Sequence, residues 1–126
     1  INPLIEVYGL DISSYAINNS KDEINQRLSL GNAIDLPYKN DFFDLVLSIN
    51  TIDHLDIDEA IKAISEIERV KKNNSFISLN SWNTNKQKDN LMSWNLVSKT
   101  IMSKTDWKIF LKTNNYSGDY YWFLAN

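Results

Sequence analysis

The sequence contains no cysteine, a single histidine, three glycines and two prolines among its 126 residues. The lack of cysteine excludes a disulfide framework, a thiolate nucleophile and a cysteine-ligated metal, and the lone His54 excludes a histidine-rich metal site within one chain. No apolar run approaches the roughly 18 residues that cross a bilayer. The formal net charge of −3 is not the basic excess that nucleic-acid binding favours. These features predict a cytoplasmic protein with no metal, no membrane partner and no nucleic-acid partner.

The composition is that of a folded protein, with 43% hydrophobic and 23% charged residues. At this length we expect one domain that covers residues 1–126. Apolar runs rich in β-branched and aromatic residues predict strands, and apolar residues at three- and four-residue spacing predict helices. The predicted strands are 4–10, 27–30, 43–49, 75–82 and 116–124. The predicted helices are one that begins after Ser13 or Ser14, then 57–70, 86–102 and 105–112.

Strands and helices alternate along the chain, which is typical of an α/β fold. The strand over 43–49 is nearly continuous in apolar residues, as in a parallel sheet that is covered on both faces. We therefore predict a Rossmann-like, doubly wound, mostly parallel sheet with helices on both faces.

Ligands of such sheets bind outside the carboxyl ends of the strands, so the residues after each strand are the site candidates. Asp11 follows the first strand, and its carboxylate has two oxygens that can accept the hydroxyl hydrogens of a ribose. A helix-capping or loop role for Asp11 is the alternative. Asn32 follows the second strand beside Gly31, and Asn50 follows the third.

The run GNAIDLPYKNDFFDLV, residues 31–46, closely resembles a segment of class I S-adenosylmethionine-dependent methyltransferases. In that family the segment reads G-[DN]-A-x-x-L-P-[FY]-x-x-x-x-F-D-x-V. The segments 8–13, 48–51 and 66–70 are also similar to the family, so the resemblance extends in order from residue 4 to about residue 82. It implies S-adenosylmethionine as the cofactor and methyl transfer as the reaction.

The resemblance also implies a role for individual residues. Asp11 would bind the ribose hydroxyls of the cofactor, and Ile12 would lie against the adenine. Asn32 stands where the family usually has Asp and would meet the adenine amino group, with Ala33 beside it. The methionine end of the cofactor and the substrate would lie near Ile49 and Asn50.

One feature of the family has no counterpart in this sequence, namely the glycine-rich [DE]-x-G-x-G loop after the first strand. The chain is therefore expected to be an N-terminally incomplete methyltransferase domain that begins at the family's second strand and is inactive as it stands. A missing central strand would expose a sheet edge, and a second copy of the chain could pair with it. The expected methyl acceptor is a small molecule. His54 and Asp53, after the third strand, are weak candidates for a general base.

Two other functions are compatible with the same fold. A non-catalytic or partner-dependent domain, which oligomerises through the exposed sheet edge, would explain the missing glycine-rich loop. A nicotinamide-binding Rossmann enzyme also has an acid after its second strand. The spacing of Leu36, Pro37 and Tyr38 to Phe43 and Asp44 disfavours the nicotinamide enzyme.

Overall fold

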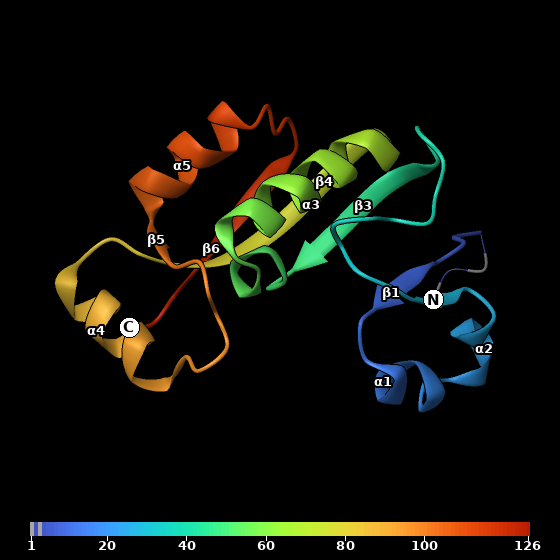
Figure 1. Ribbon diagram of the computed structural model, residues 1–126, viewed down its shortest axis with the longest axis horizontal. Helices are drawn as coiled ribbons and strands as arrows, with labels where there is room; N and C mark the ends of the chain where they lie inside the picture. The colour runs from blue at the N-terminus through green and yellow to red at the C-terminus, as the bar shows by residue number, and fades with distance from the viewer. Residues whose placement is uncertain (1, 3) are drawn as a thin grey trace. The chain divides into compact units, whose positions relative to one another are not determined.

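The computed structural model describes residue 2 and residues 4–126. The chain forms two compact units, residues 1–37 and residues 38–126, and each is described by itself. The mostly parallel sheets and the helices that accompany them confirm the predicted Rossmann-like α/β class (Figure 1).

The first unit is a short parallel β-strand pair with two small helices. Strand β1 (Gly9–Asp11) pairs with β2 (Leu28–Leu30), so that Asp11 lies opposite Leu30. The connection contains α1 (Ser14–Asn18) and α2 (Asp22–Asn25).

Two predictions for this unit are wrong in extent. We predicted a strand over 4–10, but β1 begins only at Gly9. Its partner β2 is three residues long, and residues 5–8 pair with no strand in the described part of the chain. The single predicted helix is two helices. The break falls at Asn19 and Ser20, residue types that favour caps and turns over helix interiors.

The second unit is a parallel sheet around one long central strand. Strand β4 (Lys71–Trp82) pairs with β3 (Phe43–Ile49) on one side. On its other side it pairs with β6 (Asp119–Leu124), and at its carboxyl end with β5 (Met102–Ser103). All these pairings are parallel, so the carboxyl ends of the strands lie at the same end of the sheet.

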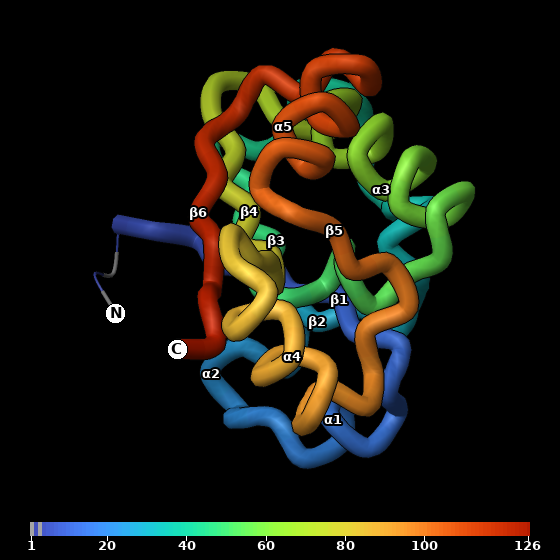
Figure 2. Tube along the Cα trace, turned by 90° about the vertical axis from the view of Figure 1, so that its left-hand side faces the viewer, coloured from blue at the N-terminus to red at the C-terminus, as the bar shows by residue number. Residues whose placement is uncertain are grey.

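The core of the second unit lies between β4 and two helices on the same face of the sheet, α3 (Ile57–Val70) and α5 (Lys104–Thr113) (Figures 1 and 2). Helix α3 begins at a capping box, in which the Asp56 carboxylate accepts from the Glu59 backbone and Glu59 accepts from the Asp56 backbone. The buried apolar side chains of this core are Ala60, Ala63, Ile64, Ile67, Val70, Ile77, Leu79, Trp107, Phe110 and Leu111.

Helix α4 (Asn85–Trp94) is shorter than the predicted helix 86–102. The Asn95 side-chain oxygen accepts hydrogen bonds from the backbone of Val97 and Ser98, which folds the chain into a turn in place of another helical turn. Leu96, which the predicted helix included, lies beyond the end of α4 and is 91% exposed.

The other face of the sheet is apolar and more open. Leu45, Leu47 and Ile49 alternate along β3 and are all exposed, while Trp94 of α4 packs edge-on against Phe123 of β6. Strand β3 has a strand neighbour on one side only within the described residues.

A cluster of hydrogen-bonded polar side chains lies at the start of β4 in the second unit. The Lys71 ammonium donates to the Glu68 carboxylate and to the Ser117 hydroxyl, at 2.6 Å each, and the Ser117 backbone donates to Glu68 at 3.0 Å. A Cβ atom on the neighbouring Gly118 would collide with Ser75 and Tyr116, so this close approach requires glycine.

The cluster predicts an acid-dependent loss of stability. Burial alone raises the pKa of Glu68, but hydrogen bonds from Lys71 and Ser117 outweigh burial and hold that pKa below its ordinary value of 4.5. Ionised Glu68 therefore stabilises the fold above about pH 4.5, and the contribution is lost as the pH falls through the lowered pKa. The free energy of unfolding of Glu68→Gln, measured by urea denaturation at pH 7, should be lower than that of the parent by less than about 1 kcal/mol, because the Glu68 carboxylate is partly exposed. The difference should shrink below pH 4; a difference that is constant with pH would contradict this assignment.

Candidate cofactor site

Within the first unit, the carboxyl ends of β1 and β2 bring Asp11 and Asn32 to one place. The Gly31 backbone N–H donates to the Asp11 carbonyl oxygen at 2.9 Å, directly after the paired residues Asp11 and Leu30. Four of the predicted site residues, Asp11, Ile12, Asn32 and Ala33, therefore lie at two adjacent strand ends.

Asp11 has both a local role and a free acceptor. One carboxylate oxygen accepts the backbone N–H of Ser13 at 2.8 Å, and the Ser13 hydroxyl in turn caps α1 through the Ala16 N–H. The second carboxylate oxygen has no hydrogen-bond partner among the described residues, and Asp11 is exposed. The loop role considered from sequence is thus present, and it leaves an oxygen for a ligand hydroxyl.

The neighbouring side chains have the chemistry that an adenosine requires. Ile12 is 75% exposed, so an apolar surface is available beside Asp11 for a flat ring. The Asn32 side-chain oxygen accepts the Ile34 N–H at 3.2 Å, while the Asn32 amide nitrogen makes no hydrogen bond within the described residues. Ala33, which follows Asn32, is half-buried. An acceptor for hydroxyls, an apolar surface and an amide at two adjacent strand ends fit the adenosine part of S-adenosylmethionine.

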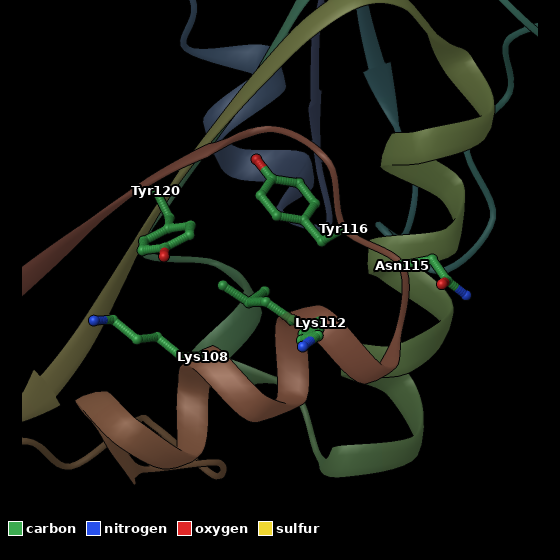
Figure 3. Close-up of a pocket in the computed structure, with 6 residues that line it drawn as sticks. Lys108, Lys112, Asn115, Tyr116 and Tyr120 are labelled. Atoms are coloured by element: carbon green, nitrogen blue, oxygen red, sulfur yellow. The ribbon is translucent and has the colours of Figure 1, made fainter.

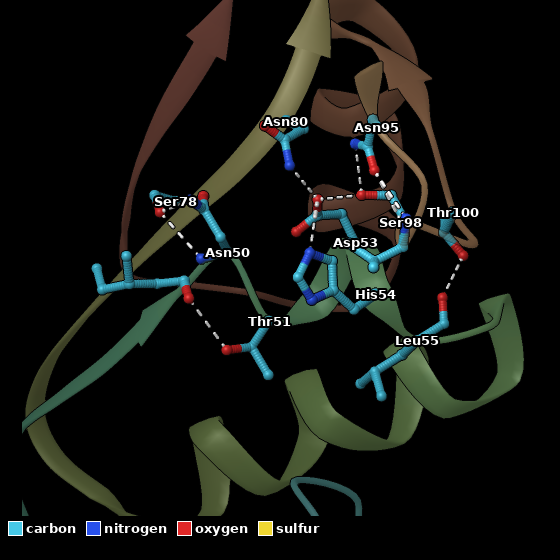
Figure 4. Close-up of polar contacts among 12 residues, drawn as sticks. Asn50, Thr51, Asp53, His54, Leu55, Ser78, Asn80, Asn95, Ser98 and Thr100 are labelled. Carbon is cyan, nitrogen blue, oxygen red and sulfur yellow. Dashed lines mark hydrogen bonds and ion pairs between the residues drawn. The ribbon is translucent and has the colours of Figure 1, made fainter. Parts of the chain in front are cut away.

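Within the second unit, Ile49 and Asn50 lie where β3 ends (Figure 4). Asn50 has a φ of 47°, in the left-handed region that asparagine tolerates better than most residues. Ser78 of β4 holds this turn: its carbonyl and hydroxyl oxygens both accept the Asn50 N–H at 3.1 Å, and its hydroxyl donates to the Asn50 side chain at 2.9 Å. The exposed Asn50 is thereby fixed at the carboxyl edge of the sheet.

Asp53 is fully buried near this edge, and its hydrogen bonds join its own segment to β4 and to residues 98–100 (Figure 4). One of its carboxylate oxygens accepts from the Asn80 amide at 2.6 Å and from the Ser98 hydroxyl at 2.8 Å. Its carbonyl oxygen accepts the backbone N–H groups of Lys99 and Thr100. These contacts give Asp53 a structural role, which the sequence did not reveal because its partners lie 27 and 45 residues away.

His54 is more accessible than Asp53. Its side chain is 40% exposed, and its Nε2 lies 4.0 Å from the Asp53 carboxylate. That separation is too long for a hydrogen bond, and neither residue is shown to contact an acceptor. A role for His54 or Asp53 in proton transfer stays a prediction.

Residues 2–79 match the methyltransferase domain family, which is more than half of the chain, and the chain belongs to that family. It is 31% identical over 94 residues to an Arabidopsis thaliana tRNA (carboxymethyluridine(34)-5-O)-methyltransferase. That match covers 74% of this chain and 23% of the relative. This chain is also 39% identical over 64 residues to an uncharacterized protein of Methanocaldococcus jannaschii, and the match covers 51% of this chain and 26% of that relative. The matched region is about a quarter of the length of either relative.

Solved structures with a similar fold are also described as methyltransferases. A chain in a Haloferax volcanii complex of the Trm112 methyltransferase activator with a methyltransferase has a TM-score of 0.66 at 19% identity, and the match covers 85% of this chain and 49% of that one. A Bacillus halodurans methyltransferase has a TM-score of 0.56 at 17% identity, with 85% and 58% covered. At these identities the similarity establishes the fold, and it agrees with the family found from sequence.

The prediction of a small-molecule substrate with no nucleic acid is wrong. The Arabidopsis relative is named for methylating a tRNA nucleoside, and the Haloferax structure is a complex of a methyltransferase with an activator protein. The sequence argument failed because it used net charge, which averages over acidic and basic parts of the chain. None of the described helices has the length and apolar character needed to span a membrane.

Proposed function

We propose that this protein transfers a methyl group from S-adenosylmethionine to an oxygen of a tRNA nucleoside. The observation that carries the proposal is the pair of strand ends with Asp11 and Asn32 in a chain of the methyltransferase domain family. The free carboxylate oxygen of Asp11 would accept the ribose hydroxyls, with Ile12 against the adenine and Asn32 and Ala33 at its edge. Ile49 and Asn50 would line the methionine and acceptor side.

The choice of acceptor rests on the Arabidopsis relative, which is named for an oxygen of carboxymethyluridine at position 34 of tRNA. A carboxymethyl group is ionised at neutral pH, so its oxygen is nucleophilic without the loss of a proton. The cofactor supplies a methyl group that is already activated as a sulfonium. The protein then has to align the acceptor with the donor and exclude water, which are the contributions of proximity and orientation.

A dependence on a protein activator is the second part of the proposal. A protein of the same fold occurs in complex with the Trm112 activator, and Leu45 and Leu47 leave an apolar surface on β3 exposed. Exposed apolar surface of this kind is typical of a site that another polypeptide covers. Methyl transfer by the protein alone is therefore expected to be slow, and to rise when an activator is added.

The test is methyl transfer from S-adenosylmethionine with a tritiated methyl group to bulk tRNA, with and without an activator of the Trm112 type. Label should appear in tRNA, in a modified uridine after digestion to nucleosides, and Asp11→Asn should reduce it. A protein that binds the cofactor and labels only small molecules, or labels tRNA equally well with Asp11→Asn, would contradict the proposal.

A further inference from the structure

Charge is distributed very unevenly along this acidic chain. Residues 82–126 contain six lysines and three acidic residues, whereas residues 1–81 contain seven lysines and arginines against thirteen acidic residues. The C-terminal third is therefore basic, although the whole chain carries a net charge of −3. A basic segment within an acidic protein indicates a surface for an anionic partner.

Three of these lysines form a row along α5. Lys104, Lys108 and Lys112 are spaced four residues apart, which places them on one side of the helix. The helix buries Trp107, Phe110 and Leu111 against the sheet and leaves Lys108 and Lys112 exposed. No ion pair joins the three ammonium groups to a carboxylate within the described residues.

The last part of the row opens into a pocket with aromatic side chains (Figure 3). Lys108 and Lys112 line it from α5, Tyr116 from the segment that leads into β6, and Tyr120 from β6 itself. The Tyr116 hydroxyl is held by Ser75 and by the Asp119 carbonyl oxygen. Tyr120 is 42% exposed, so much of its side chain is accessible.

Two neighbouring carboxylates are already engaged elsewhere. The Glu68 carboxylate bonds Lys71 and Ser117, and the Asp106 carboxylate accepts from the Ser103 hydroxyl at the start of α5. Asp106 also lies on another side of α5 from the lysine row, given 100° of rotation per residue. The lysines therefore keep their charge available to an external group.

We infer that the Lys104–Lys108–Lys112 row and the Tyr120 side chain form a contact surface for the backbone of an RNA. A rise of 1.5 Å per residue separates successive lysines in the row by about 6 Å along the helix axis. That step is close to the distance between neighbouring phosphates of one RNA strand, so each ammonium can meet a phosphate. Tyr120 offers a ring on which an unpaired base stacks.

RNA fits this surface better than an acidic peptide does. A regular row of point charges next to an exposed aromatic ring matches a partner with evenly spaced anions and flat bases. The inference rests on the proposed tRNA acceptor, and it concerns binding of the RNA backbone by residues other than the proposed cofactor residues.

Binding of tRNA, measured by fluorescence anisotropy over a range of salt concentrations, tests the surface. Lys104→Gln/Lys108→Gln/Lys112→Gln should weaken binding at least about tenfold and reduce the slope of log affinity against log salt by about three. The matched control is Lys62→Gln/Lys72→Gln/Lys21→Gln, which removes the same charge from exposed lysines outside the row. The control should retain most of the affinity and of the salt slope.

The outcomes separate this inference from the proposed function. Equal losses in the two triple variants, or no tRNA binding by the parent protein, would overturn the RNA surface, whether or not the protein methylates tRNA. A selective loss in the α5 variant would support the surface even if methyl transfer to tRNA were absent. Tyr120→Ala should weaken binding of a single-stranded oligonucleotide about fivefold or more, whereas Tyr120→Phe should leave it unchanged.

Discussion

Replacing Trp107 with alanine is expected to lower the free energy of unfolding by about 3–5 kcal/mol, the range for removing a large buried aromatic side chain. Trp107 is fully buried on α5, and its ring packs edge-on against Phe110 with centroids 5.4 Å apart. Its indole N–H donates to the Asn80 carbonyl oxygen at 3.1 Å. The variant loses this packing and the hydrogen bond to the Asn80 carbonyl oxygen.

The Trp107→Phe variant separates these two contributions. It keeps an aromatic ring in the core but removes the hydrogen bond to Asn80, so a loss of about 1–3 kcal/mol is expected. Urea unfolding followed by circular dichroism measures both variants. A loss below about 1 kcal/mol for Trp107→Ala would show that α5 does not pack against β4 as described.

The predictions from sequence succeeded where one element has a strong local pattern. Strand β3 and helix α3 have the predicted bounds, 43–49 and 57–70. The strand is a nearly unbroken apolar run, and the helix combines an apolar face with the Asp56 and Glu59 caps. Such elements are specified largely by their own residues.

The predictions failed where the structure depends on distant partners or on side-chain competition. Residues 5–8 have the composition of a strand, yet no described strand pairs with them. The apolar residues Leu96 and Val97 continue the hydrophobic spacing of α4. The helix nevertheless ends, because the Asn95 side-chain oxygen accepts hydrogen bonds from the backbone N–H groups of Val97 and Ser98. Neither effect is visible in hydrophobic periodicity.

The candidate site was predictable in part for the same reason. Asp11 and Asn32 follow directly after strands, and parallel pairing of β1 with β2 brings them together. The network of Asp53 with Asn80 and Ser98 was not predictable, because it joins segments far apart in the sequence. The lysine row on α5 carried a local signal, four-residue spacing, which the net charge concealed.

Asp11→Ala is the substitution with the largest expected effect on the cofactor. An ionised carboxylate that binds two hydroxyl groups contributes about 1–3 kcal/mol, so the affinity for S-adenosylhomocysteine should fall by roughly five- to 150-fold. Asp11 is exposed, and among the described residues its side chain hydrogen-bonds only to Ser13. The fold should therefore tolerate the change. Asp22→Ala, at another exposed acid of the same unit, is the matched control.

Isothermal titration of S-adenosylhomocysteine into the protein and its Asp11→Ala and Asp22→Ala variants tests the cofactor site most directly. The site described here predicts that the parent and Asp22→Ala bind alike and that Asp11→Ala binds much more weakly, with unchanged circular dichroism for all three. Equal binding by Asp11→Ala, or no binding by the parent, would contradict a cofactor site at the carboxyl ends of β1 and β2.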